Sequence, residues 1–293
     1  MSNTVISHGG KMTQIIPWGK LLAQDATGYL INDCHIDNIT PPWTLLVEEL
    51  RERVQQTWLT RLQALYLRGS VPRGLALPQV SDLDSFAILF GEISGLDRSL
   101  ARQICSQLQK RYLFCQKVEL ILLTQADIEQ QHSIWPSIIQ IKSLKIAGED
   151  LPISLPQFKP GHSLINYAYT WAMDLAQTLD ILSQLSPQNS RFSAQVKKQC
   201  RWIMRRMVRT GFELVMEQDQ SYTPDLYYCF QRFALYFPEQ QREMAKALQL
   251  ALFPSANRPG LMVFLRGFGG WLVERVISSP KFKNLGSETL PLQ

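Results

Sequence analysis

The feature that most restricts how this 293-residue chain can fold is a short segment in its first third. An apolar run, 63–67, leads through Arg68 into the pair Gly69-Ser70, and a second apolar run opens shortly afterwards with Asp82 and Asp84. Side chains alternate between the two faces of a strand, so Asp82 and Asp84 are expected on one face where the second strand begins. The segment therefore predicts two strands, with a glycine turn after the first and two carboxylates at the start of the second.

These residue types suit the binding of a metal ion and a phosphate group. Two carboxylates on one face repel each other, and a hard divalent cation such as Mg²⁺ bound between them offsets that repulsion. Gly69 lets the backbone come close to a ligand, and Ser70 offers a hydroxyl and an N–H at a place where a helix could begin. Arg73 would add a bidentate contact to a phosphate. A metal ion beside a phosphate indicates phosphoryl or nucleotidyl transfer.

The same residues resemble the motif of a known superfamily. Gly-Ser followed by Asp-x-Asp is the pattern of the nucleotidyltransferases (the polymerase-β-like fold), and Gly-Ser-x-x-Arg-Gly with Ser-Asp-x-Asp resembles their minimal and aminoglycoside-modifying branches. The resemblance is specific over roughly residues 62–124 and implies a third carboxylate on a later strand. Glu119, in the apolar run 117–124, would supply it, either as a metal ligand or as the base that accepts the proton of the attacking hydroxyl.

Two residues depart from the family pattern. Arg68 and Ser85 stand where the family usually has apolar residues, and both lie beside the expected site without removing a ligand. They put the fit of the substrate in question more than the binding of a metal. Taken separately, Asp-Leu-Asp before a strand is explained as a loop cap and Gly-Ser as an ordinary turn, so the combination at this spacing carries the functional interpretation.

The distribution of strand and helix signals predicts two architectures in succession. Up to about residue 155, strands alternate with helices expected from Thr40 to about Arg61 and over 97–112, a pattern typical of a small mixed α/β sheet. The segment 134–142 is ambiguous, and 146–151 reads as a last edge strand. Beyond three closely spaced prolines the chain predicts helices only, near 161–184, 191–218, 223–236, 237–253 and 259–277.

We therefore expect four parts. They are an N-terminal extension (1–40), a nucleotidyltransferase-like catalytic domain (41–155), an all-α helical C-terminal domain (156–279) and a flexible tail (280–293). Members of the family often carry such a helical domain, in agreement with this division. Arg266-Gly267-Phe268-Gly269-Gly270 lacks a preceding strand, so we interpret it as a helix kink or a close packing contact and not as a phosphate loop.

Composition points to a cytoplasmic protein. No run of eighteen apolar residues is present and the first residues lack the pattern of a secretory signal, so no membrane partner is expected. The five cysteines are scattered without a Cys-x-x-Cys pair, which is typical of free thiols in a reducing compartment. The segment Cys34-His35-Ile36-Asp37 gives little support for a zinc site, because the four histidines are far apart in the sequence.

The positive charge is concentrated in the C-terminal half. Residues 158–279 contain 14 Lys and Arg against 9 Asp and Glu, which accounts for the whole net charge of +5. On a helix, Lys197, Arg201, Arg205 and Arg209 form one basic stripe, explained either as a solvated face or as a site for a triphosphate or RNA. This charge favours anionic partners and argues mildly against an aminoglycoside. Tyr222 and Asp225, in a turn that enters a helix, are candidates to line a cleft, although helix capping explains them equally well.

The sequence thus predicts a Mg²⁺-dependent nucleotidyltransferase that binds a nucleoside triphosphate. The expected reaction transfers a nucleoside monophosphate, AMP from ATP by the habit of the family, to a hydroxyl of a small molecule or protein. The alternative is a non-catalytic module that binds nucleotide or RNA on the same scaffold. Three carboxylates, Asp82, Asp84 and Glu119, argue against it, since a binding scaffold has no need of them.

Overall fold

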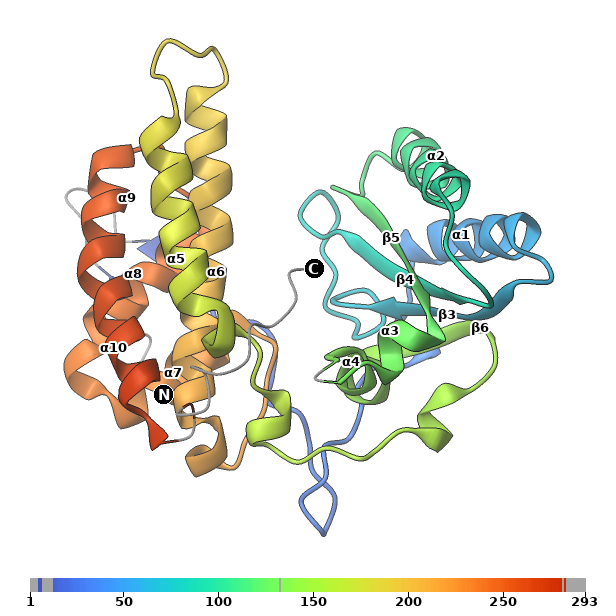
Figure 1. The fold of residues 1–293 in the computed structure, drawn as a ribbon, viewed down its shortest axis with the longest axis horizontal. Helices are drawn as coiled ribbons and strands as arrows, with labels where there is room; N and C mark the ends of the chain where they lie inside the picture. The colour runs from blue at the N-terminus through green and yellow to red at the C-terminus, as the bar shows by residue number, and fades with distance from the viewer. Residues whose placement is uncertain (1–4, 7–12, 132, 281, 283–293) are drawn as a thin grey trace. The chain divides into compact units, whose positions relative to one another are not determined.

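The computed structural model describes residues 5–6, 13–131, 133–280 and 282, which form two compact units (Figure 1). The helical unit combines residues 1–21 with 160–293, and the sheet unit comprises residues 22–159. The division between the units therefore follows residue 159, where the sequence suggested 155, and the first forty residues are shared between them. Apart from Pro280 and Phe282, the predicted tail lies outside the described residues.

The sheet unit is built on four strands. They are β3 (Leu62–Arg68), β4 (Leu83–Leu89), β5 (Val118–Thr124) and β6 (Ser143–Gly148), in the spatial order β5-β4-β3-β6. Strand β3 is antiparallel to both β4 and β6, whereas β4 and β5 are parallel. The predicted mixed sheet is confirmed. The last strand begins three residues earlier than expected, because it follows the preceding helix directly and stays paired with β3 as far as Gly148.

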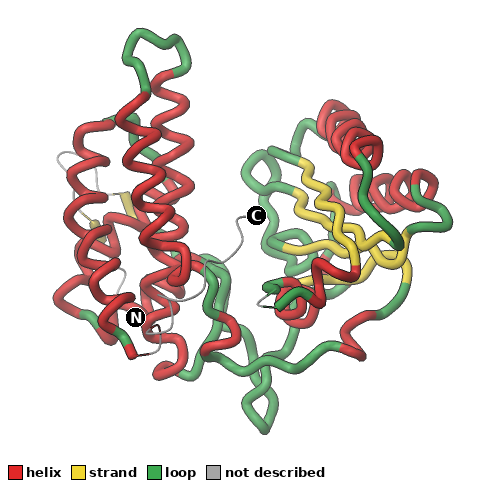
Figure 2. The backbone as a smooth tube through the Cα atoms, viewed as in Figure 1, coloured by secondary structure: helices red, strands yellow, loops and turns green. Residues whose placement is uncertain are grey.

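Helices cover both faces of this sheet (Figures 1 and 2). On one face α1 (Trp43–Thr57) and α2 (Gly95–Arg111) enclose a core with Leu65 and Leu67. On the other, α3 (Gln125–Glu129) and α4 (Trp135–Lys142) enclose a core with Ala64 and Tyr66. The ambiguous segment is thus helix α4. Alternate residues of β3 enter different cores, as the two-residue period of a strand requires.

The beginning of α2 is held by a buried carboxylate. The Ser94 hydroxyl accepts the N–H of Asp97, and Asp97 accepts the N–H and hydroxyl of Ser94, forming a capping box. Asp97 also accepts the indole N–H of Trp58 at 2.8 Å and a guanidinium N–H of Arg61 at 2.9 Å. These donors lower the pKa of Asp97 far below its usual range, with the Ser94 hydroxyl contributing most.

The helical unit confirms the expected all-α region. Its helices are α5 (Tyr167–Gln184), α6 (Phe192–Asp219), α7 (Leu226–Tyr236), α8 (Gln241–Leu252), α9 (Arg258–Phe264) and α10 (Gly270–Ser278). A two-stranded antiparallel ribbon of β1 (Val5–Ile6) and β2 (Thr13–Gln14) belongs to the same unit. Short 3₁₀ turns occur at Ile36–Asn38, Leu151–Ser154, His162–Leu164 and Pro238–Gln240.

Two sets of hydrogen bonds connect α5 with other elements of this unit. The buried Glu213 of α6 accepts the N–H groups of Asn166, Tyr167 and Ala168, and so caps the start of α5 from a neighbouring helix. Between α9 and α10 the chain forms a π-helical turn, Leu265–Gly269, whose Gly269 carbonyl accepts the indole N–H of Trp171 at 3.1 Å. The predicted irregularity at the glycines is therefore a π-bulge.

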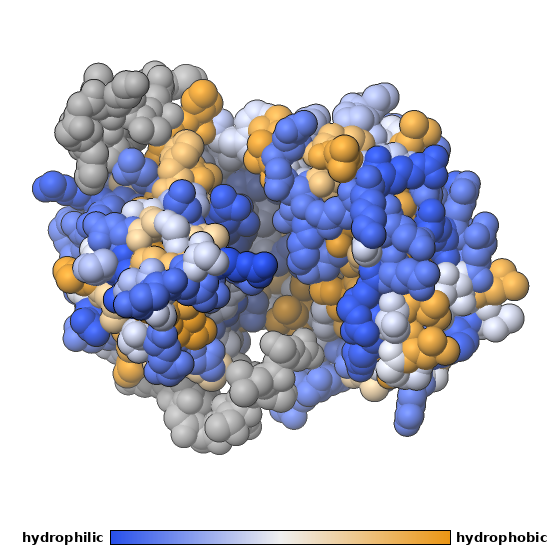
Figure 3. All heavy atoms as spheres, turned by 90° about the horizontal axis from the view of Figure 1, so that it is seen from above, coloured by the Kyte–Doolittle hydropathy of each residue, from blue (hydrophilic) through white to orange (hydrophobic). Residues whose placement is uncertain are grey.

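On the face that Figure 3 shows, hydrophilic side chains predominate and hydrophobic ones form smaller patches. Within the described residues, none of the helices has the length and apolar character that crossing a bilayer demands.

Candidate functional site

The predicted site residues of the sheet unit lie in a row across three strands. Arg68 at the end of β3 is the register partner of Asp84 in β4, and Asp84 is the partner of Glu119 in β5. Neighbouring strands are about 4.8 Å apart, so these three side chains are adjacent on the sheet. By alternation they share the face of Tyr66 and Phe86, which α3 and α4 cover further along the strands. The structure thus gathers one cation and two carboxylates at one edge of that face.

The Gly69-Ser70 turn closes over this row. Gly69 has a φ of +83°, a conformation that favours glycine, and a Cβ atom built on it would lie 2.9 Å from Oδ2 of Asp84. A side chain at residue 69 would therefore collide with the carboxylate. The turn backbone thus comes close to Asp84, whereas the sequence motif predicted an approach of this backbone to a ligand.

The turn does not lead into a helix, however. The carbonyl of Ser70 accepts the N–H of Leu75 at 2.9 Å, and that of Val71 accepts the N–H of Gly74 at 3.1 Å, so residues 70–74 form successive turns. The idea that a helix begins here is wrong. Any phosphate held at Ser70 would contact its hydroxyl and turn N–H groups, without a helix dipole behind them.

Glu119 is surrounded by positive charge. Its carboxylate accepts Nζ of Lys117 at 2.5 Å and a guanidinium N–H of Arg68 at 3.2 Å. Burial acts to raise the pKa of Glu119, but the Lys117 hydrogen bond and both cations outweigh it, so the pKa is lowered. Glu119 therefore remains ionised and is a weak proton acceptor.

Asp84 has the opposite electrostatics. Burial raises its pKa, and the charges of Glu119 and Asp82 raise it further, while Arg68 and Lys117 act against them. Asp82, directly before β4, is half-buried and close enough to influence Asp84 electrostatically. Bringing these carboxylates together thus costs free energy in the folded protein, and a bound cation would recover that cost.

Arg73 is the predicted phosphate ligand whose surroundings differ most from the expectation. Its side chain is buried, and Nε donates to both carboxylate oxygens of Asp33, at 2.9 and 3.0 Å. Nearby, Asn38 donates to the carbonyl of Pro72 at 3.0 Å. The segment before α1 therefore braces the loop that follows Ser70. This explains why residues 22–40 belong to the sheet unit and gives Arg73 a structural role there.

Two further residues of the site were not identified from the sequence as functional. Lys117 lies two positions before Glu119, on the same side of the chain, and this spacing was the signal available. Arg68, noted as a departure, is paired with Glu119, and its buried Nε has no hydrogen-bond partner in the structure. The other departure, Ser85, is buried and donates to the carbonyl of Glu119 at 2.6 Å, which ties β4 to β5.

The described residues contain no group of three or more His, Cys, Asp or Glu side chains arranged to hold a metal ion. Asp82 and Asp84 offer hard oxygen donors at the Gly69 turn, the donor type that Mg²⁺ prefers. Magnesium is commonly held by one or two carboxylates, with substrate phosphates completing its coordination. These two residues fit that mode of binding, whereas Glu119 is paired with two cations, Arg68 and Lys117.

A groove of about 730 Å³ runs between α2 and β5 and reaches Glu119. Arg98, Arg102 and Lys110 contribute positive charge from α2, and Ser106 and Gln109 contribute neutral polar groups. Of the row, only Glu119 lines this groove, which lies within the sheet unit.

The two cleft candidates of the helical unit have structural partners. Tyr222 is 6% exposed, which leaves little ring surface for stacking, and burial raises the pKa of its hydroxyl well above the usual value. Asp225 precedes α7 and accepts the backbone N–H of Lys20 at 2.9 Å. Thr223 donates to the carbonyl of Lys20 at 2.7 Å and accepts the N–H of Asp225. These contacts attach the segment around Lys20 to the turn before α7.

Comparison with known proteins finds no matching family model and no matching curated protein. Among solved structures, the chain is similar to a spectinomycin adenyltransferase, AAD(9), from Enterococcus faecialis, determined with ATP and spectinomycin. The two share 14% sequence identity, with 80% of this chain and 98% of that chain covered, and the TM-score is 0.47. Similarity at this level carries no information on activity, so the function proposed below depends on the residues described above.

Proposed function

We propose that the protein is a Mg²⁺-dependent nucleotidyltransferase whose reaction takes place on the sheet unit. The observation that carries the proposal is the row Arg68, Asp84 and Glu119 across β3, β4 and β5, with the Gly69 turn packed against Asp84. A carboxylate that is costly to keep ionised, beside a turn that only glycine fits, has no structural purpose that the surrounding contacts reveal.

In the proposed reaction, a hydroxyl oxygen of the acceptor forms a bond to the α-phosphorus of a nucleoside triphosphate. The bond from that phosphorus to the oxygen bridging to the β-phosphate breaks, pyrophosphate leaves with the electron pair, and the hydroxyl proton passes to water. Asp82 and Asp84 would hold Mg²⁺, which supplies charge neutralisation at the phosphates. Gly69 and Ser70 would hold phosphate oxygens through backbone N–H groups and the hydroxyl.

Glu119 has a positioning role in this proposal. The pKa of Glu119 is lowered, and its two ion-pair partners are the cations Lys117 and Arg68. Glu119 therefore orients these two side chains and does not act as the base. The two cations are then placed to contact phosphate oxygens from the side of β5. Following the resemblance, we propose AMP from ATP as the transferred group, with a small molecule or a protein as acceptor.

The test is pyrophosphate release from ATP, CTP, GTP and UTP with Mg²⁺, using cell extract as a pool of acceptors. The variant Asp82→Asn/Asp84→Asn is compared with Asp37→Asn/Glu52→Gln, which removes two exposed carboxylates of the same unit. We expect nucleotide-specific release by the wild type and the control pair, and none by the Asp82/Asp84 pair. Calorimetry of Mg²⁺-nucleotide binding is run on the same proteins. A wild type that neither releases pyrophosphate nor binds nucleotide would exclude the proposed function.

A further inference from the structure

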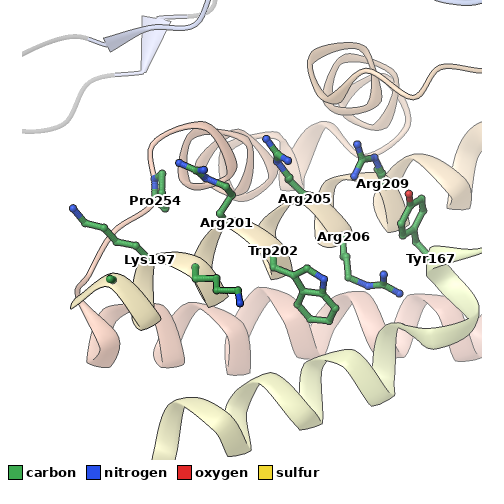
Figure 4. A pocket seen from close by; sticks show the side chains of 10 residues that line it. Tyr167, Lys197, Arg201, Trp202, Arg205, Arg206, Arg209 and Pro254 are labelled. Atoms are coloured by element: carbon green, nitrogen blue, oxygen red, sulfur yellow. The ribbon is translucent and has the colours of Figure 1, made fainter. Parts of the chain in front are cut away.

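A second groove, of about 660 Å³, lies entirely within the helical unit along α6 (Figure 4). One residue comes from the start of α5, eight come from α6 and one comes from the loop that follows α8. The lining residues are Tyr167, Ala194, Lys197, Lys198, Arg201, Trp202, Arg205, Arg206, Arg209 and Pro254. The groove therefore contains the basic stripe that the sequence singled out, together with two aromatic rings.

The charge of this groove is of one sign. Among the described residues that line it, none carries a carboxylate. Arg206 is paired with a carboxylate that does not line the groove, because its Nε donates to the buried Asp174 of α5 at 2.6 Å. Lys197, Lys198 and Arg201 are exposed on the surface of α6. A concave surface with several cations on one helix attracts a ligand that carries several negative charges.

The cations are spaced along a line. Figure 4 shows the side chains of Arg201, Arg205 and Arg209 extending to one side of α6, while Trp202 and Arg206 extend to another. Residues four apart on a helix are separated by roughly 6 Å along its axis, so the row from Lys197 to Arg209 extends over roughly 18 Å. A repeating anion of extended form matches such a row better than a single phosphate group does.

Both aromatic rings of the groove pack against Arg206. The guanidinium carbon of Arg206 lies 5.0 Å from the ring centre of Trp202 and 5.2 Å from that of Tyr167. Asp174 and the hydroxyl of Thr170 hold Arg206, which thus packs against both rings from a fixed position. Trp202 is nevertheless 41% exposed. A tryptophan held at the surface beside a line of cations offers a flat face on which a base can stack.

We propose that the α6 groove binds a single strand of nucleic acid. The phosphates would contact the line of cations and a base would stack on Trp202. An acidic peptide has no flat ring in each repeat, and a duplex conceals the faces of its bases, so a single strand fits both features. This proposal goes beyond the proposed transfer reaction and does not depend on it, because binding is measured without nucleotide.

The test uses fluorescence anisotropy of a fluorescein-labelled twelve-residue oligouridylate, titrated with the full-length protein at several salt concentrations. Lys198→Gln/Arg201→Gln is compared with Arg242→Gln/Arg266→Gln, which removes two exposed arginines from other helices of the same unit. Each phosphate contact contributes about −0.7 to the slope of log K against log salt for single strands. We expect the groove pair to reduce the slope by about 1.4 and the control pair to leave it unchanged.

Substitution of Trp202 distinguishes the binding of nucleic acid from the binding of other polyanions. Loss of one stacked base corresponds to roughly 5- to 150-fold weaker binding, so we expect that effect from Trp202→Leu, with the salt slope preserved. Trp202→Phe, which retains a ring, should restore most of the affinity, and thermal melting checks that each variant is folded. Absence of salt-dependent binding, or equal losses in the groove and control pairs, would overturn the proposal. So would wild-type affinity in Trp202→Leu, or displacement of the RNA by inorganic tripolyphosphate at equal phosphate concentration.

Discussion

Two carboxylates of the sheet unit, one at the start of α2 and one at the start of β4, have opposite surroundings. Asp97 is buried among hydrogen-bond donors from Ser94, Trp58 and Arg61, and its pKa is strongly lowered. Asp84 lies next to other carboxylates, and burial raises its pKa. The first arrangement stabilises the fold, whereas the second costs stability. On the strength of this difference we propose a structural role for Asp97 and a functional one for Asp84.

The largest effect that this comparison predicts concerns activity. Asp84→Asn keeps the size of the side chain but removes the negative charge proposed to hold Mg²⁺, which contributes several kcal/mol to the transition state. We expect the rate of nucleotidyl transfer to fall by about 10³-fold or more, measured as pyrophosphate release. Asp97→Asn, compared per folded molecule, should retain activity. Comparable losses in both variants would show that the two carboxylates do not differ in role.

The next effect concerns stability, and here substitution of Asp97 is expected to have a larger effect than substitution of Asp84. Asp97→Ala leaves the Trp58 indole and part of the Arg61 guanidinium without an acceptor, so the free energy of unfolding should fall by about 2–4 kcal/mol. Urea denaturation followed by circular dichroism measures it. Because the pKa of Asp97 is lowered in the folded state, its contribution is present above the unfolded pKa near 3.8 and is lost as pH falls below it. The wild type and Asp97→Ala should therefore approach each other in stability under acidic conditions.

A substitution at Gly69 tests whether the backbone of the turn beside Asp84 contributes to activity. Gly69→Ala introduces a Cβ atom 2.9 Å from Oδ2 of Asp84 in a left-handed conformation, which costs about 1–2 kcal/mol. Gly91→Ala is the matched control, since Gly91 has a φ of +75° with nothing near the added atom. Both variants should lose similar stability in thermal melting, but only Gly69→Ala should also lose transfer activity. Equal activity in the two variants would show that the Gly69 turn does not take part in the reaction.

The smallest effect is a gain. The pKa of Asp84 is raised in the folded state, so the protein loses stability as pH rises from the unfolded pKa through the folded one. At neutral pH, Asp84→Asn should therefore raise the melting temperature by roughly 2–4 °C, the shift expected for about 1 kcal/mol in a domain of this size. A melting temperature that falls would mean that ionised Asp84 stabilises the fold through its neighbours.

The sequence predicted the elements whose residues follow one period over many positions. Helices α2 and α6 and strand β4 were identified from their apolar residues. That Glu119 lies beside Asp84 agrees with what the family resemblance implied, a third carboxylate on a later strand. The start of β6 was misplaced, since no turn residue separates it from α4. The partner of Arg73 was not predictable, because Asp33 lies 40 residues away in a segment without periodicity.

The helical unit is built from two segments that the sheet unit separates in the sequence, and this affects the order of folding during translation. The sheet unit is complete once residue 159 has been made, whereas the segment around Lys20 meets Asp225 only 205 residues after its own appearance. At about 5–20 residues per second, that interval lasts roughly 10–40 s on the ribosome. Throughout it the contacts of Lys20 with Thr223 and Asp225 cannot form, while the nascent sheet unit can already collapse. The order in which the two units mature is thus set by translation, with the unit that contains the chain's first residues finishing last.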